Sequence, residues 1–197
     1  MKLNGFYILD TIMEYNTSVQ SQTFPPNLTP EIQSTLFPSF YNAMVADNYQ
    51  GDFIVSIYRK EDESLNKALS QAWQSLSDPL YQMENLQLPI SNLTLLINGG
   101  FGDFLRSDHT NFWMKSLPAV FMTDSANYRG DMIDCYHESC DNRNVMLTED
   151  NLKFLGKQAD ALYNSLLYLE ETGTASADAI KGCFVILLMT KLVFVLV

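Results

Sequence analysis

The sequence predicts an α/β domain. Short apolar runs typical of buried strands alternate with segments whose apolar residues recur at helical spacing. The chain has 197 residues, of which 47% are hydrophobic and 18% are charged, and these values suit one folded domain with its own core. The pattern contains no internal repeat and no low-complexity segment.

The chain begins with a predicted strand followed by a polar loop and a helix. Residues 5–13 form an apolar run that contains Asp10, as expected for a buried strand that places one carboxylate at its end. Residues 28–46 show helical spacing, but Pro38 lies inside them. Because proline cannot continue a helix, this segment must break or kink there.

The middle of the chain continues the alternation of strands and helices. FIVSIY at 53–58 predicts a strand, and residues 64–76 predict a capped helix. A short apolar run at 93–97 predicts another strand that ends at two glycines. Residues 107–115 then predict a short helix, and 118–122 a strand.

The last helix is the clearest element. Thr148 suits an N-cap, two acidic residues follow it at the positive end of the helix dipole, and Gly173 supplies a stop. The apolar residues between these two signals recur at helical spacing and are expected to pack in the core. They are Leu152, Leu155, Ala159, Leu162, Leu166 and Leu169.

The chain ends in two segments of different composition. Small and acidic residues over 173–181 predict a linker after a folded part at 1–172, and an almost wholly apolar tail follows at 182–197. The tail is shorter than the roughly 20 residues that a helix needs to cross a bilayer, although Lys191 could snorkel. Three interpretations stay open: a marginal membrane anchor, a buried terminal strand or helix, and a non-native tail from a faulty gene annotation.

The formal net charge of −11 excludes one class of partner. A surface that binds nucleic acid needs clustered lysine and arginine, and the sequence has no such cluster. We therefore expect no nucleic-acid partner, and solubility explains the acidity most simply.

Cysteine spacing and glycosylation sequons indicate an oxidising compartment. Cys135 and Cys140 can close a small disulfide loop that holds Tyr136 and His137 between them, whereas a redox pair would be spaced CxxC. A disulfide favours an extracellular or secretory location. A chain that is associated with a membrane is compatible with the same location. Three asparagines stand in N-x-S/T sequons and are candidates for glycosylation: Asn16, Asn27 and Asn92.

Four blocks stand in an order that is typical of one family: ILDTIMEYN at 8–16, RSDHTNFW at 106–113, PAVFMTDSANYR at 118–129 and CYHESCD at 135–141. Together they resemble the C-terminal half of the catalytic domain in metallopeptidase family twenty-eight, the di-zinc aminopeptidases that include glutamate carboxypeptidase-like proteins. The resemblance implies a three-layer α/β/α zinc-peptidase fold with a central mixed sheet. In this chain that fold would be incomplete at its N-terminal side.

The resemblance also implies a site. Asp10 matches a carboxylate ligand of one zinc ion, and His137 matches an imidazole ligand of the other. Tyr136 matches a tyrosine whose hydroxyl stabilises the tetrahedral intermediate, and Arg106 matches an arginine that contacts substrate. Two zinc ions would polarise the scissile carbonyl and supply hydroxide.

Two further residues have structural counterparts in the family, and several ligands have none here. Asp108 and His109 resemble a structural pair in which the carboxylate caps a helix. The family's first histidine, bridging aspartate and Glu-Glu pair precede the strand of Asp10, where this chain has nine residues without His, Asp or Glu. The chain is therefore expected to be inactive alone, with the missing N-terminal half as a partner.

Two functions remain as hypotheses. The first is a metallopeptidase that hydrolyses peptide substrates with two zinc ions and is present here as a fragment. The alternative is a non-catalytic receptor-like or membrane-complex interaction module on the same fold. In the alternative, the apolar tail at 182–197 would supply a membrane contact.

Overall fold

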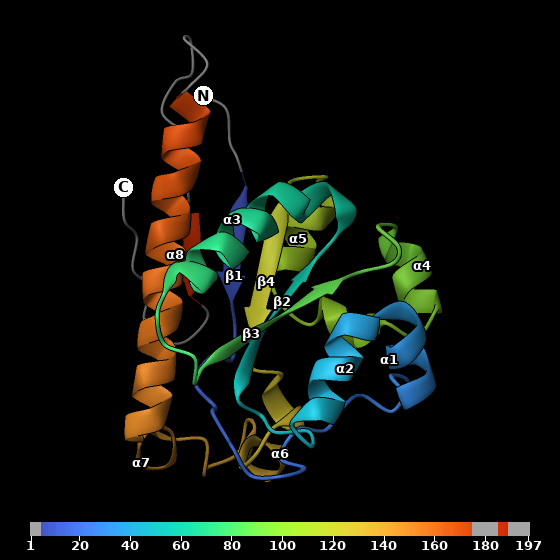
Figure 1. The fold of residues 1–197 in the computed structure, drawn as a ribbon. Coiled ribbons are helices and arrows are strands. Elements are labelled where there is room, and N and C mark those ends of the chain that lie inside the picture. The colour runs from blue at the N-terminus through green and yellow to red at the C-terminus, as the bar shows by residue number, and fades with distance from the viewer. Residues whose placement is uncertain (1–4, 175–184, 189–197) are drawn as a thin grey trace.

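The computed structural model describes residues 5–174 and 185–188, and these contain a five-stranded mixed sheet. The strands are β1 (Phe6–Leu9), β2 (Phe53–Tyr58), β3 (Gln82–Gln87), β4 (Ala119–Thr123) and β5 (Val185–Leu188). They lie in the order β3-β2-β4-β1-β5 (Figure 1). β1 is parallel to β4 and β5, β2 is parallel to β3, and β2 and β4 are antiparallel. The predicted α/β class and mixed sheet are confirmed.

Helices lie on both faces of the sheet (Figure 1). One face is covered by α3 (Glu63–Ser75) and α8 (Glu149–Thr174). The other face carries α1 (Pro30–Leu36), α2 (Pro38–Ala46), α4 (Leu93–Asn98) and α5 (His109–Met114). Short turns of helix connect these elements: η1 (Lys60–Asp62), η2 (Gly102–Leu105), η3 (Ala126–Tyr128), α6 (Met132–Cys135) and α7 (Arg143–Met146).

Strands β1, β2 and β4 are buried on both faces because helices cover both. Successive side chains of a strand point to opposite faces. Phe6 and Ile8 therefore pack in the core beside α1, α2 and α5, whereas Tyr7 and Leu9 pack in the core beside α3 and α8. All four residues of β1 are buried, as expected for a strand with parallel neighbours inside an α/β layer.

Helix signals in the sequence are found at the expected places. Thr29 caps α1 with its hydroxyl, and Pro30 begins the helix, where its missing N–H costs nothing. The break predicted at Pro38 is confirmed, since α1 and α2 are separate helices and Pro38 begins the second. Thr148 accepts a hydrogen bond of 3.1 Å from the Asn151 amide, which confirms the predicted cap of α8.

Helix α8 is tied to the sheet by buried polar contacts. The Tyr7 hydroxyl donates to the Leu65 carbonyl at 2.9 Å and is 2.7 Å from the Ser165 hydroxyl on α8. Burial raises the pKa of Tyr7 well above its ordinary value. The Gln158 amide of α8 donates to the Ile12 carbonyl at 2.8 Å. Among the described residues, no helix is both long enough and apolar enough to cross a membrane.

Two elements differ from the prediction. Residues 93–97 were expected to form a strand, but they lie in α4, and Asn92 caps this helix by accepting from the Leu95 amide. A short apolar run fits a strand or a buried helix equally well, so the N-cap at Asn92 is the signal that distinguishes the helix from a strand. Strand β3 was not predicted, because its sequence QMENLQ is polar and only Leu86 is buried.

The C-terminal segments are described in part. Residues 173 and 174, assigned to the linker from the sequence, belong to α8, and 175–181 lie outside the described residues. Within the tail at 182–197, residues 185–188 form β5 beside β1, and the others lie outside the described residues.

Candidate functional site

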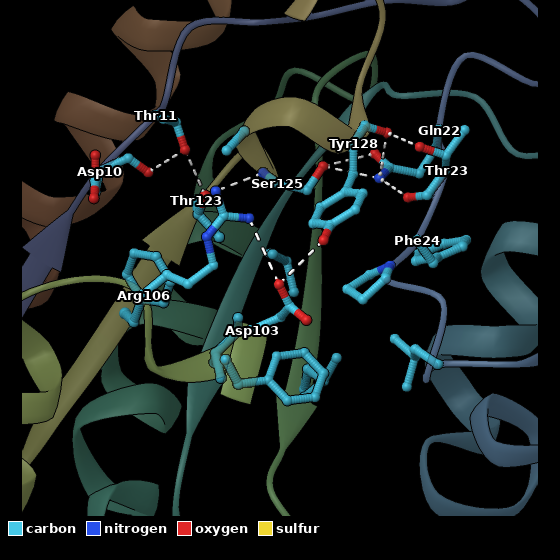
Figure 2. A pocket seen from close by; sticks show the side chains of 18 of the residues that line it. Asp10, Thr11, Gln22, Thr23, Phe24, Asp103, Arg106, Thr123, Ser125 and Tyr128 are labelled. Carbon is cyan, nitrogen blue, oxygen red and sulfur yellow. Dashed lines mark hydrogen bonds and ion pairs between the residues drawn. The ribbon is translucent and has the colours of Figure 1, made fainter. Parts of the chain in front are cut away.

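A pocket opens at the end of the sheet formed by the carboxyl ends of strands β1 and β4. Asp10 and Thr11 follow β1, Thr123 closes β4, and Ser125 comes two residues later; all four line the pocket. In open α/β sheets ligands bind outside the carboxyl ends of parallel strands, which is this position. Figure 2 shows Asp10 and Phe24 on opposite sides of the opening.

The floor of the pocket is apolar and continues into the core. The cavity encloses about 80 Å³, which has room for several water molecules or for one aliphatic side chain. Burying such a side chain contributes about 1.5–3 kcal/mol. Buried side chains from the sheet and from the α1–α2 region form the floor: Leu28, Phe40, Phe53, Val55, Leu86 and Phe121.

Arg106 stands on the rim in a fixed position. Its Nη1 donates to the Asn127 side-chain oxygen at 2.8 Å and lies 3.7 Å from Asp103. The guanidinium carbon is 5.8 Å from the Tyr128 ring centre and 5.6 Å from that of Tyr136, so cation–π attraction adds to the polar contacts. Figure 2 shows Arg106 and Tyr128 both directed at Asp103.

The rim residues Asp103 and Tyr128 were missed by the sequence analysis. The Tyr128 hydroxyl donates to Asp103 at 3.1 Å. Burial, followed by this hydrogen bond and the Asp103 charge, raises the pKa of Tyr128. Tyr128 lies inside the block that carried the resemblance, but its sequence gives no sign that it meets Asp103.

Asp10 is positioned by the backbone around it. Its amide donates to the Met122 carbonyl of β4 at 3.2 Å, which continues the sheet pairing by one residue. The Thr11 hydroxyl bonds to the Asp10 carbonyl at 2.6 Å and contacts the Thr123 hydroxyl at 2.7 Å. The half-buried Asp10 therefore lies at the end of β1, where the sequence placed it, and lines the pocket; its role as a metal ligand stays a prediction.

Backbone strain is concentrated at this site. Eight described non-glycine residues have positive φ, and three of them line the pocket: Thr11 (51°), Ser125 (83°) and Ala126 (54°). A fourth, His137 (64°), is exposed and follows Tyr136, which lines the pocket. Such conformations cost about 1–3 kcal/mol each and cluster at functional sites in proteins.

Tyr136 and His137 lie in the loop between Cys135 and Cys140. The two cysteines form a disulfide with their Cα atoms 5.2 Å apart. The rings of Tyr136 and His137 stack with centres 3.9 Å apart. Tyr136 is half-buried and faces the pocket, whereas His137 is exposed.

A metal centre is not formed by the described residues alone. Asp10 and His137 are the two predicted ligands, and one zinc ion needs about three protein donors. Nowhere in residues 5–174 and 185–188 do three or more His, Cys, Asp or Glu side chains gather so that they could hold a metal ion. The residues present therefore do not fit the predicted pair of zinc ions without further donors.

Asp108 and His109 lie outside the pocket. Asp108 precedes α5, but its side chain accepts no hydrogen bond from that helix, so the expected cap is not observed. His109 is fully buried; its Nε2 is 2.8 Å from the Phe104 carbonyl, and its ring stacks on Phe121 at 4.3 Å. Burial lowers the pKa of His109 to about 4. This enclosed position suits the structural role that was expected.

A buried ionic cluster supports the pocket, and the sequence analysis did not find it. Arg129 is fully buried; its Nε donates to Gln22 at 2.9 Å, and its Nη1 donates to the carbonyls of Glu14, at 3.1 Å, and Phe53. The Glu14 amide donates to Asp124 at 2.8 Å. Burial raises the pKa of Glu14 and Asp124 and lowers that of Arg129 to about 10. Because charged residues are rarely this buried, the composition of the sequence does not predict such a cluster.

Comparison with family models, with curated proteins and with solved structures found no match to this chain. The three sequon asparagines, Asn16, Asn27 and Asn92, lie outside the lining of the pocket.

Proposed function

We propose that this chain binds peptides at the pocket and belongs to a peptide-hydrolysing domain of the di-zinc aminopeptidase type. The observation that supports the proposal is the combination of an apolar floor with Arg106 and Tyr136 on the rim. A peptide matches both parts of the pocket. Its apolar side chains suit the floor, and its polar backbone suits the hydrogen-bond donors on the rim. Ligand pockets in proteins commonly have this composition.

The floor would receive one apolar side chain of the peptide. Arg106, held by Asn127 and Asp103, would donate hydrogen bonds to a backbone carbonyl or carboxylate of the same peptide. The Tyr136 hydroxyl is a second donor on the rim. Donors that are fixed in advance stabilise a carbonyl oxygen most strongly when it gains negative charge.

Zinc is the cofactor that the resemblance implies, with Asp10 and His137 as one predicted ligand for each of two ions, and the described residues contain no group of three or more donors that could hold a metal ion. We therefore assign no reaction step to zinc in this chain. Hydrolysis belongs to a complete domain in which further donors and a general base come from elsewhere.

The lack of a three-donor group among the described residues favours a second candidate. On this alternative the chain is a non-catalytic receptor-like or membrane-complex interaction module that binds peptide segments without cleaving them. An extracellular or secretory location is part of both proposals and is supported by the Cys135–Cys140 disulfide.

Peptide binding is tested by calorimetric titration of the full chain with a leucine-containing tripeptide and with the same peptide carrying aspartate. The leucine peptide should bind about tenfold more tightly, which corresponds to about 1.4 kcal/mol. Arg106→Gln should weaken binding, whereas Arg143→Gln, at an exposed position away from the pocket, should not. Equal affinity of both peptides, or no effect of Arg106→Gln, would refute the proposal.

Zinc content and hydrolysis test whether this chain forms the enzyme by itself. The full chain, dialysed against zinc, is compared with His137→Ala by elemental analysis and by release of the N-terminal residue from the leucine peptide. Zinc that is lost in His137→Ala, together with hydrolysis, would show a peptidase that needs no further donors and would refute the interaction module. Binding of the peptide without zinc or cleavage is the result expected of the interaction module and of an enzyme whose further donors come from elsewhere.

A further inference from the structure

A second hollow lies between α4 and α5, and exposed apolar side chains stand among the polar ones that line it. It measures about 540 Å³. Ile97 and Met114 line it although they are 60% and 67% exposed, and the buried Trp113 lies behind them. Exposed apolar side chains in a concave surface can mark a place that another group covers. We call this hollow the α4–α5 groove.

A glycosylation sequon stands on the wall of the α4–α5 groove. Asn92 and Thr94 both line it, and both are exposed. The Asn92 oxygen Oδ1 accepts from the Leu95 amide at 3.1 Å and caps α4. A glycan is attached to the nitrogen Nδ2, for which no hydrogen-bond partner is found among the described residues. Glycosylation would therefore leave the cap intact.

The other two sequon asparagines already use their side-chain nitrogen or its surroundings in contacts with the protein. The Asn27 Nδ2 donates to the Gly100 carbonyl at 3.3 Å. The Asn16 side chain hydrogen-bonds to the Glu14 carboxyl group, and its Nδ2 lies 2.7 Å from where a Cβ on Gly130 would stand. A sugar on Asn16 would crowd the backbone at Gly130 and the buried Glu14 carboxylate, and a sugar on Asn27 would leave its nitrogen only one N–H, which already faces Gly100.

From these contacts we infer that Asn92 carries an N-linked glycan whose first sugars cover the α4–α5 groove. The Nδ2 atom attacks the anomeric carbon of a lipid-diphosphate-linked oligosaccharide, loses a proton and releases the lipid diphosphate. The apolar faces of the sugar rings then lie against Ile97 and Met114. This inference is independent of the peptide pocket.

Occupancy is tested by secreting the full chain from eukaryotic cells behind a secretion signal and treating it with peptide-N-glycosidase. Asn92→Asp removes the acceptor but keeps a good N-cap oxygen, and Thr94→Ala removes only the sequon hydroxyl. Treatment should lower the mass of the parent chain, Asn27→Asp and Thr94→Ser, and leave Asn92→Asp and Thr94→Ala unchanged. A mass decrease in Asn92→Asp, or none in the parent chain, would overturn the assignment.

Coverage of the groove is tested by peroxide oxidation of methionine, followed by peptide mass spectrometry. Met114 should oxidise at least about threefold faster in Asn92→Asp than in the glycosylated parent, because the sugars no longer shield its sulfur. Met146, which does not line the groove, serves as an internal reference and should oxidise equally in both. Equal rates at Met114 would refute the covering of the groove even where Asn92 is occupied.

Discussion

Glu84 lies on strand β3 beside two other carboxylates, and this arrangement makes stability depend on pH in a defined way. Burial, followed by the charges of Asp47 and Asp52, raises the pKa of Glu84 from 4.5 to about 7. Asp52 is itself 7% exposed, and one of its carboxylate oxygens has no hydrogen-bond partner. The charge of Arg129 acts to lower the pKa of Asp52, but the Arg129 Nε donates its hydrogen bond to Gln22.

The sign follows from the two protonation states. Between pH 4.5 and about 7 the folded chain holds a proton on Glu84 that the unfolded chain releases. The resulting stability is fully present below pH 4.5 and is lost as the pH rises through about 7. This difference between the folded and unfolded pKa of Glu84 corresponds to about 3 kcal/mol in the free energy of unfolding. Because Glu84 is partly exposed, solvent screening reduces the effect to about 1–2 kcal/mol.

Glu84→Gln should therefore raise the free energy of unfolding by about 1–2 kcal/mol at pH 8 and leave it nearly unchanged at pH 4.5. The assay is urea unfolding followed by the fluorescence of the buried Trp73 and Trp113. Glu138→Gln, at an exposed position, controls for the loss of one negative charge. His109 contributes a slope of opposite sign, but both proteins contain it, so it cancels in the difference. Equal effects of Glu84→Gln at both pH values would show that the reasoning is wrong.

Three further changes have defined outcomes. Arg129→Met removes the buried counter-charge of Glu14 and should cost about 3–5 kcal/mol, seen as a lower urea midpoint. His109 has a pKa lowered to about 4, so the unfolded chain binds its proton first as the pH falls below 6.5; His109→Phe should flatten the loss of stability between pH 6.5 and 4. Replacing Cys135 and Cys140 together by serine opens a loop with a sequence separation of 5, which should cost about 2 kcal/mol and make the urea midpoint insensitive to reductant.

The fold was predictable wherever local signals agree. Pro38 and Thr148 specify helix boundaries by steric and capping effects that act within one turn, and the structure has them at those positions. Residues 82–87 could not be predicted, because their pairing with β2 comes from tertiary contacts and not from their own polar sequence. Residues 93–97 were assigned from apolar character, which is common to strands and buried helices, although Asn92 already indicated a helix cap.

The candidate site was predictable in part. The structure brings Asp10, Arg106 and Tyr136 to one pocket, although they lie far apart in the sequence. Their catalytic and metal-binding roles stay predictions. The contact between Asp103 and Tyr128 depends on how the short helical turns η2 and η3 approach each other, and no residue pattern within either turn encodes that distance.

The position of β1 in the sheet has a consequence for how the chain is made. Its pairing with β4 joins Phe6 to Ala119, so this apolar strand leaves the ribosome more than 100 residues before its first neighbour in the described sheet. At typical synthesis rates this interval lasts roughly 5–20 s. Closing so long a loop also slows folding, because the entropy of closure is lost before the contacts form. While the residues between the two strands are synthesised, the nascent chain therefore exposes the apolar segment Phe6–Leu9, to which molecular chaperones that recognise short apolar stretches could bind.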